Sequence, residues 1–277
     1  MATVAASAVK EWDWRANIFR VVVVLTALGT SLHHGLLALL APWFLPIDPT
    51  EPGYEAAAHL WHEAQYGTQV GILFGGCLVA LFWRPRAQPL LLQFLVLANL
   101  GNMLLMALTI PGAKNFLLIL IIALGILIAA YPRPRALVEF SSSAPISRHL
   151  LAVTGLATVF LVLDISRNLR WQLAGIGGEH LAFHHWQNAI FLACLLVGAG
   201  ALSAMKRPGW RALGIITGVA FLYLGLAALT LPQQAGSWGS PGGILSLLAG
   251  ALFVTVTLRE ARTTRGADRS AWQESAA

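Results

Sequence analysis

Long apolar stretches alternate with short polar connections along almost the whole chain. A hydrocarbon core about 30 Å thick requires roughly 20 mostly apolar residues in each spanning helix. Eight stretches approach or reach that length, at 19–41, 60–83, 88–110, 114–131, 149–170, 181–204, 209–231 and 242–258. The connections between them leave no room for a separate soluble domain. The pattern therefore predicts an all-α integral membrane protein with eight transmembrane helices.

Charged residues are scarce, which supports the same class. Of the 277 residues, 57% are hydrophobic and 11% are charged, whereas a typical soluble domain is about 25% charged. With eight spans, both termini lie on one side of the membrane. That side carries most of the basic residues, namely Lys10, Arg15, Arg20, Arg84, Arg86, Arg133, Arg135, Arg148, Lys206, Arg207, Arg211, Arg259, Arg262, Arg265 and Arg269.

The opposite side carries only Lys114, Arg167 and Arg170. An excess of lysine and arginine on one side marks the cytoplasmic face. We therefore expect a multi-pass protein of the cell membrane with both termini cytoplasmic. Its net charge of +6 then serves orientation and contact with anionic membrane lipids, and no nucleic-acid partner is expected.

The two halves of the chain resemble each other. LMALTIP at 105–111 corresponds to LAALTLP at 226–232, and HLWHEAQ at 59–65 corresponds to HLAFHHWQ at 180–187. LFWRPRAQPLL connects the second and third predicted spans, and AMKRPGWRAL connects the sixth and seventh. We interpret this order as a tandem duplication, with four helices in 1–140 and four in 141–277. Two even-numbered units are related by an axis along the membrane normal.

Seven of the eight histidines fall on the predicted extracytoplasmic side, and His149 is the exception. They are His33, His34, His59, His62, His180, His184 and His185. His180 and His184 open the span 181–204 and are four residues apart, so they are expected to share a helical face. Such a pair binds zinc, copper or iron through imidazole. The predicted metal ligands are His34, His62, His180, His184 and His185.

Two carboxylates are candidates for catalysis at the same level. Glu63 follows His62 and could act as a general base, and Asp164 ends the fifth span. Asp164 could equally be neutralised by Arg167, three residues later. Any single histidine could also be an ordinary interfacial residue, and that interpretation is preferred for His59.

The tryptophans at this level have two interpretations. Trp61, Trp171 and Trp186 are assigned to an aromatic belt at the membrane surface. Trp171 and Trp186 could instead form walls of a cofactor pocket.

Three functions fit these features. The first is a membrane metalloenzyme acting on a lipophilic small molecule, with a copper or iron oxidoreductase favoured over a zinc hydrolase. The second is a non-catalytic haem- or metal-binding protein for electron transfer, sensing or delivery. The third is a small-molecule transporter or structural subunit. The apolar inner halves of 60–83 and 181–204 argue against a path for a charged substrate.

The strings HxxHE and HxxxHH resemble the histidine boxes of membrane fatty-acid desaturases and hydroxylases. The paired four-helix halves are similar to those of haem A synthase. The desaturase boxes face the cytoplasm, whereas these strings face outward in the predicted topology. Spans 114–131 and 242–258 carry no histidine where the second family has axial ligands. The chain is therefore assigned to neither family.

Overall fold

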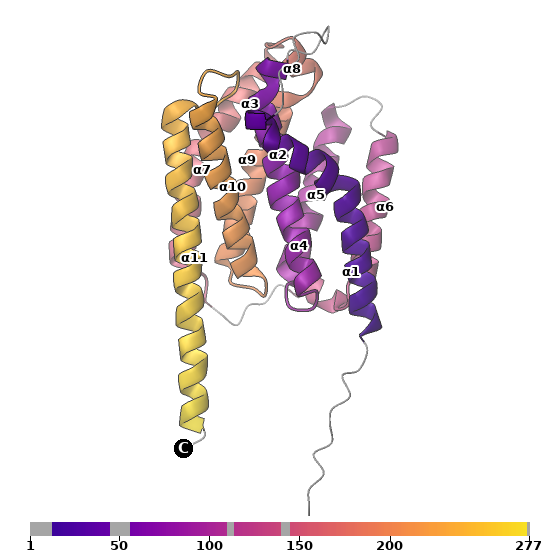
Figure 1. Ribbon diagram of the computed structural model, residues 1–277, viewed down its shortest axis with the longest axis vertical. Coiled ribbons are helices and arrows are strands. Elements are labelled where there is room, and N and C mark those ends of the chain that lie inside the picture. Colours follow the sequence, from indigo (N-terminus) through magenta and orange to yellow (C-terminus); the bar gives the residue numbers. More distant parts are fainter. Residues whose placement is uncertain (1–12, 45–55, 110–113, 140–144, 276–277) are drawn as a thin grey trace, which may run out of the picture.

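The computed structural model describes residues 13–44, 56–109, 114–139 and 145–275. All regular structure within these ranges is helical, as the apolar pattern predicts (Figure 1). The elements are α1 (Trp14–Ala27), η1 (Leu28–Gly35), α2 (Leu36–Phe44), α3 (Ala56–Gly67), η2 (Thr68–Phe74), α4 (Gly75–Trp83), α5 (Pro89–Thr109), α6 (Lys114–Ala130), η3 (Pro134–Leu137), α7 (Arg148–Leu173), α8 (Glu179–Ala182), α9 (His185–Ala204), α10 (Trp210–Thr230) and α11 (Gly239–Ser275).

Six of the described helices are long and apolar enough to cross a membrane. They cover His59–Trp83, Pro89–Ala107, Arg148–Leu173, His185–Ala204, Trp210–Thr230 and Gly239–Thr263. These six coincide with the second, third, fifth, sixth, seventh and eighth predicted spans. The chain is therefore built as a membrane protein.

The first and fourth predicted spans are also helical. Residues 14–44 form a helical segment with a π-helical part, η1, between α1 and α2. In α6, the apolar part of the described helix is the shorter segment Leu117–Ala130. The number of eight spans, their division into two repeats and the side of the termini stay predictions.

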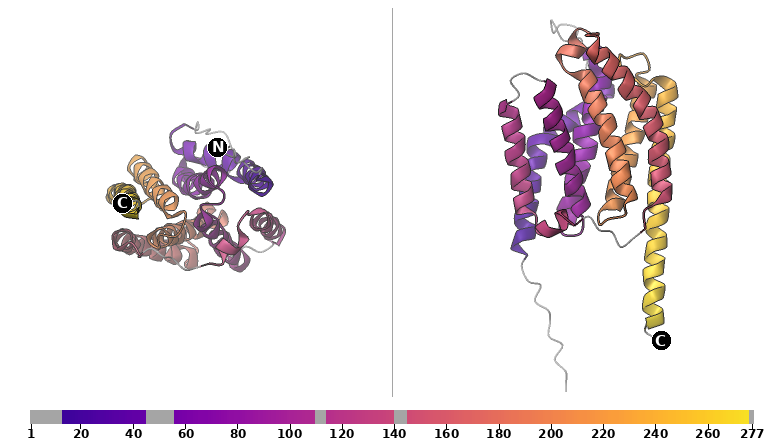
Figure 2. Two further views of the ribbon diagram at one scale, coloured as in Figure 1. Left: turned by 90° about the horizontal axis from the view of Figure 1, so that it is seen from below. Right: turned by 180° about the vertical axis from the view of Figure 1, so that it is seen from behind.

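The helices stand side by side in one bundle (Figure 2). Both ends of the described chain, at α1 and α11, lie at the lower end of Figure 1, and α8 lies at the upper end. Helix α11 continues to Ser275, although the apolar pattern ended at residue 258. The extension is polar, so its length reflects local helix formation and not burial in lipid.

The sides of the bundle expose large apolar residues. On α7 these include Leu156, Val159 and Leu163, and on α6 they include Ile119 and Ile122. A soluble monomer rarely exposes apolar patches of more than a few hundred Å². The lateral surface is therefore suited to contact lipid.

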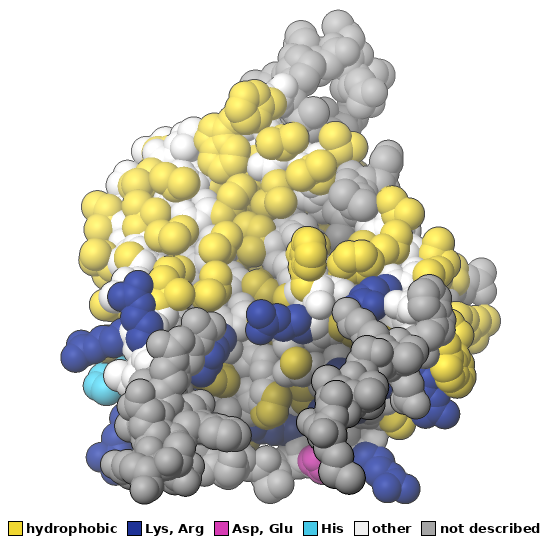
Figure 3. All heavy atoms as spheres, turned by 60° about the horizontal axis from the view of Figure 1, so that its bottom comes forward, with side chains coloured by type: hydrophobic (Ala, Val, Ile, Leu, Met, Phe, Trp, Pro, Cys, Tyr) yellow, Lys and Arg dark blue, Asp and Glu magenta, His cyan; other side chains and the backbone are white. Residues whose placement is uncertain are grey.

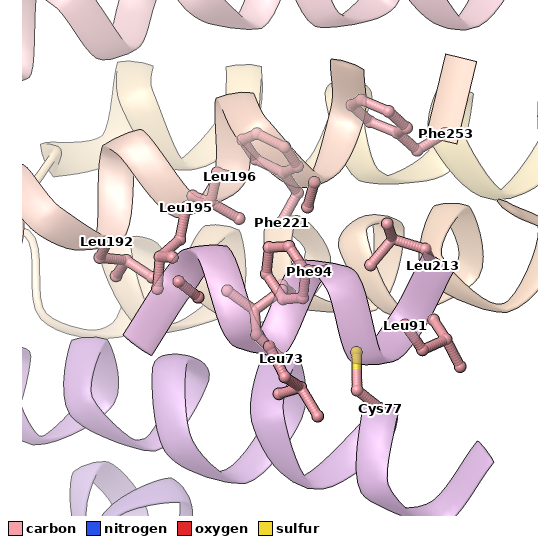
Figure 4. Packing of buried hydrophobic residues seen from close by; sticks show 14 of the residues in the cluster. Leu73, Cys77, Leu91, Phe94, Leu192, Leu195, Leu196, Leu213, Phe221 and Phe253 are labelled. Atoms are coloured by element: carbon pink, nitrogen blue, oxygen red, sulfur yellow. The ribbon is translucent and has the colours of Figure 1, made fainter. Parts of the chain in front are cut away.

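The interior is packed by leucine and phenylalanine from both halves of the chain (Figure 4). Leu73 and Cys77 from the η2–α4 segment meet Leu91 of α5, Leu195 of α9 and the other members of this cluster. Helices from the two halves thus share one core.

Glycine allows α3 and η2 to lie directly against the first helical segment. A Cβ atom at Gly35 would lie 2.8 Å from the backbone nitrogen of Gly71, and one at Gly67 would lie 2.6 Å from that of Leu39. Small residues permit this backbone approach in membrane bundles. The contact fixes the helix that carries His59 and His62.

Candidate metal centre

Four imidazoles gather at the upper end of the bundle, from helices that are distant in sequence. His59 and His62 belong to α3, His180 to the short helix α8, and His185 is the first residue of α9. The ring centroid of His59 lies 4.7 Å from that of His180 and 4.8 Å from that of His185. The ring centroid of His62 lies 4.9 Å from that of His180 and 4.2 Å from that of His185.

Three of these histidines form a group suited to a metal ion. His59, His180 and His185 each offer one ring nitrogen, and the three nitrogens lie within 4.8 Å of one another. In a tetrahedral site with metal–nitrogen bonds of about 2.0–2.1 Å, neighbouring nitrogens are about 3.3 Å apart. Small side-chain rotations would therefore bring the three imidazoles onto one ion.

A carboxylate lies beside the first of these ligands. The Nε2 atom of His59 is 3.2 Å from Oε2 of Glu179. The His59 side chain is buried, whereas that of Glu179 is 46% exposed. Carboxylates next to metal-binding imidazoles orient the ring and raise its basicity. Glu179 has the position for that role.

The fourth imidazole, His62, lies outside the three-residue group and is buried. It is 2% exposed, and its Nδ1 lies 3.1 Å from Oε1 of Gln65. Because a carboxamide oxygen only accepts hydrogen bonds, Nδ1 carries the proton and Nε2 carries a lone pair. That Nε2 is buried and has no hydrogen-bond partner among the described residues. The His62 ring stacks on His185 with an angle of 3° between the ring planes.

The predicted helical pair of His180 and His184 is wrong. Helix α8 ends at Ala182, and His184 has φ 59° and ψ 29°, the left-handed conformation, immediately before α9. The two histidines therefore do not share a helical face. In an uninterrupted helix, His180 and His185 would point about 140° apart. The turn at His184 instead brings His185 to the same group as His180, and His184 itself is outside that group.

The other predicted site residues lie elsewhere. Glu63 is half-buried on α3 and interacts electrostatically with Tyr66 and Tyr223. It is not a member of the histidine group found among the described residues. His34 belongs to η1, but its side chain lies outside the described part of the structure. Their roles as general base and ligand stay predictions.

Asp164 is buried in an ion pair. Its Oδ1 accepts a bond of 2.5 Å from the Arg167 guanidinium and one of 3.1 Å from Asn168. Arg167 also donates to the backbone oxygens of Gly236 and Ser237, at 2.6 Å and 3.0 Å. This favours neutralisation by Arg167 over a ligand role. The pair also ties the loop before α11 to α7.

That loop and a tryptophan cover His62. Trp186 is buried, its indole N–H donates to the Ile176 carbonyl at 2.8 Å, and its ring lies 5.4 Å from that of His62. Gly236 has φ 77°, and a Cβ there would lie 2.9 Å from Trp186 and 3.3 Å from His62. Trp186 is therefore a wall of the site and not a lipid-facing belt residue.

Burial and neighbouring charge hold His180 in its neutral form. Desolvation and the nearby His59 lower the pKa of His180 below its ordinary value of 6.5, and the opposing effect of Glu179 is smaller. A neutral imidazole is the form that binds a metal ion. His180 is thus ready to act as a ligand at neutral pH.

His59 is the member of the group that the sequence interpretation set aside. The sequence favours an interfacial interpretation of His59 because the residue lies at the end of a predicted helix. The repeat contained a signal for it, since the offset of 121 between LMALTIP and LAALTLP also relates His59 to His180.

Comparisons with known proteins found no match, so the site is interpreted from its geometry alone. The chain matches no protein-family model, no curated protein and no solved structure.

Proposed function

We propose that this chain is a membrane protein that holds one transition-metal ion through His59, His180 and His185. The observation that carries the proposal is the convergence of three imidazole nitrogens from α3, α8 and α9 within 4.8 Å. Lone interfacial histidines would have no reason to converge from three helices. His59 is buried, and His180 and His185 are half-buried, so the group is partly shielded from bulk water.

The ligand type selects the class of metal. Imidazole suits zinc, copper and iron, whereas magnesium and calcium prefer oxygen. A single ion is favoured over haem, because the rings of His62 and His185 stack face to face with centroids 4.2 Å apart. Two stacked rings cannot direct their nitrogens from opposite sides onto one iron between them.

The distribution of charge supports a site outside the cytoplasm. Figure 3 shows lysine and arginine side chains across the lower end of the molecule, opposite the end that carries α8. In an eight-span arrangement of two four-helix repeats, the positive-inside rule places the lower end and both termini in the cytoplasm. The metal ion then lies at the extracytoplasmic ends of the helices.

A set of three protein ligands favours catalysis over a purely structural metal site. Catalytic metal sites use three protein ligands and leave a further position for water or substrate. An apolar groove of about 510 Å³ runs between α5 and α9, from Ile190 to Leu202. It begins five residues after His185, so it could receive the chain of a lipophilic substrate from the bilayer. We therefore favour a metalloenzyme, with a copper or iron oxidoreductase ahead of a zinc hydrolase.

Equilibrium binding of Zn²⁺ and Cu²⁺ to detergent-purified protein tests the metal site. We expect one ion per chain, and a loss of affinity of at least about 100-fold for His59→Gln, His180→Gln or His185→Gln, because even indirect partners of metal ligands change affinity about 10–100-fold. His149→Gln is the matched control, because His149 lies at the end of the bundle opposite the histidine group, and it should bind the metal normally. The proposal would be refuted if the three ligand variants bound the metal as tightly as His149→Gln.

A further inference from the structure

A second cavity lies at the basic end of the bundle, where α4 ends and α10 begins. It has a volume of about 330 Å³ and lies between these two helix ends and α11. Its polar lining comes from Arg84, Gln88, Arg211 and Thr257. It is separate from the histidine cluster, which lies at the other end of the bundle.

The two arginines give this cavity a positive charge that no described carboxylate neutralises. Within the described ranges, neither Arg84 nor Arg211 forms an ion pair, whereas Arg86 pairs with Asp13 at 2.8 Å and Lys206 with Glu260 at 2.7 Å. Arg211 also stands in the first turn of α10, where the helix dipole favours an anion. The cavity is therefore suited to a negatively charged group.

A buried hydroxyl and a carboxamide in the lining indicate a polar occupant. The Thr257 hydroxyl is fully buried, and neither its oxygen nor Oε1 of Gln88 has a hydrogen-bond partner among the residues described. Threonine elsewhere in the bundle bonds the carbonyl four residues earlier, as Thr217 does with Leu213 at 2.8 Å. Burying such groups without a partner is costly. The Thr257 hydroxyl and the N–H groups of Gln88 can donate to the oxygen atoms of an anionic ligand.

The rest of the lining is apolar and continues onto the side of the bundle. It includes Ala80, Ile215 and Leu258, and Trp83 is 72% exposed at the edge. A free inorganic ion would leave this surface uncovered. Tryptophan at such a level marks the boundary between lipid chains and headgroups.

We infer that this cavity binds an anionic phospholipid, with the phosphate held between Arg84 and Arg211 and the acyl chains lying along Ile215 and Leu258. Basic pockets between transmembrane helices are suited to acidic headgroups. Arginine binds phosphate through paired N–H groups, which a single ammonium does not provide. This site does not depend on the metal proposal.

Retention of phosphatidylglycerol against phosphatidylcholine by the full chain, measured by native mass spectrometry and by thermal unfolding in mixed micelles, tests the site. We expect selective retention of phosphatidylglycerol, weakened about fivefold by Arg84→Gln or Arg211→Gln and about 25-fold by the double variant. Arg84→Lys should keep more affinity than Arg84→Gln. Arg259→Gln, an exposed change on α11 outside the cavity, should have no effect.

Three results would overturn the inference. Equal retention of the two lipids by the unmodified protein would show no preference for an anion. An equal effect of Arg259→Gln would reduce the preference to general surface charge. Thermal protection by inorganic phosphate as large as that by phosphatidylglycerol would show a site for the free ion and not for a lipid. Unfolding in phosphatidylcholine alone checks that each variant is folded.

Discussion

At the residue scale, substitutions of His184 can show whether this residue shapes the backbone or binds the metal. Its left-handed backbone costs a non-glycine residue roughly 1–2 kcal/mol, and glycine adopts it without strain. We expect His184→Gly to keep full metal affinity and to unfold at an equal or higher temperature. His184→Ala, the matched control, should bind metal but be less stable than His184→Gly. Loss of metal binding in both variants would show that His184 is a ligand.

The pKa of His180 determines how metal binding responds to acid. Because burial and His59 lower that pKa below 6.5, His180 is mostly neutral from pH 8 to about pH 7. Protonation of His180 should therefore change the metal affinity little over that pH range. Below it, the affinity should decline, because protons compete with the metal for the imidazole. The metal-free protein should also lose stability on acidification, because its unfolded state binds the proton more tightly. Affinity that rises on acidification would contradict this.

Some features of the histidine group could be predicted from the sequence, and others could not. Clustered histidines at two helix starts predicted a histidine group at one end of the bundle, and the structure brings His59, His180 and His185 together there. The grouping of His59, His180 and His185 depends on a left-handed residue at position 184, which no local pattern predicts. His59 could have been found by carrying the 121-residue offset through to His180. The enclosure by Gly236 depends on a long-range contact and could not be read locally.

At the scale of elements, helix α7 holds the loop before α11 over the histidines. Arg167 connects the buried Asp164 to the carbonyls of Gly236 and Ser237. Removing one partner of a buried pair leaves an uncompensated charge and costs about 3–5 kcal/mol. We therefore expect Arg167→Gln to lower the thermal unfolding temperature strongly.

The double variant Asp164→Asn/Arg167→Gln should recover much of that loss, since it removes both charges. It should also retain metal binding, with an affinity reduced far less than in His180→Gln. Metal titration of the double variant checks this. If its affinity falls as far as that of a ligand variant, Asp164 belongs to the metal shell.

Apolar length was enough to predict the helices but not their interruptions. The span that begins at residue 60 contains the π-helical part η2, and the start of the sixth span is broken between α8 and α9. HLAFHHWQ carries one residue more than HLWHEAQ. The structure places its left-handed turn within this longer string. The residues involved remain apolar enough overall that hydropathy alone shows no break.

At the scale of the whole molecule, the two ends of the bundle have opposite chemistry. The end that carries α8 gathers imidazoles, and the other end gathers lysine and arginine (Figure 3). An eight-span bundle with cytoplasmic termini would place the first end outside the cell and the second inside. The orientation can be tested independently of any metal.

Cysteine labelling in intact cells tests that orientation. In a Cys194→Ala background, Ile176→Cys, exposed between α7 and α8, should react with a membrane-impermeant maleimide from outside. Ala87→Cys, exposed between α4 and α5, should react only after permeabilisation. The reverse pattern would place the histidines in the cytoplasm.

X-ray absorption spectroscopy of zinc-loaded protein tests the three-imidazole site most directly. We predict a first shell dominated by nitrogen at about 2.0–2.1 Å, with the scattering pattern of three imidazoles. His59→Gln should reduce that pattern to two imidazoles, while His149→Gln should leave it unchanged. A first shell of oxygen or sulfur, or a spectrum indifferent to His59, His180 and His185, would contradict the assignment of these three residues as the metal ligands.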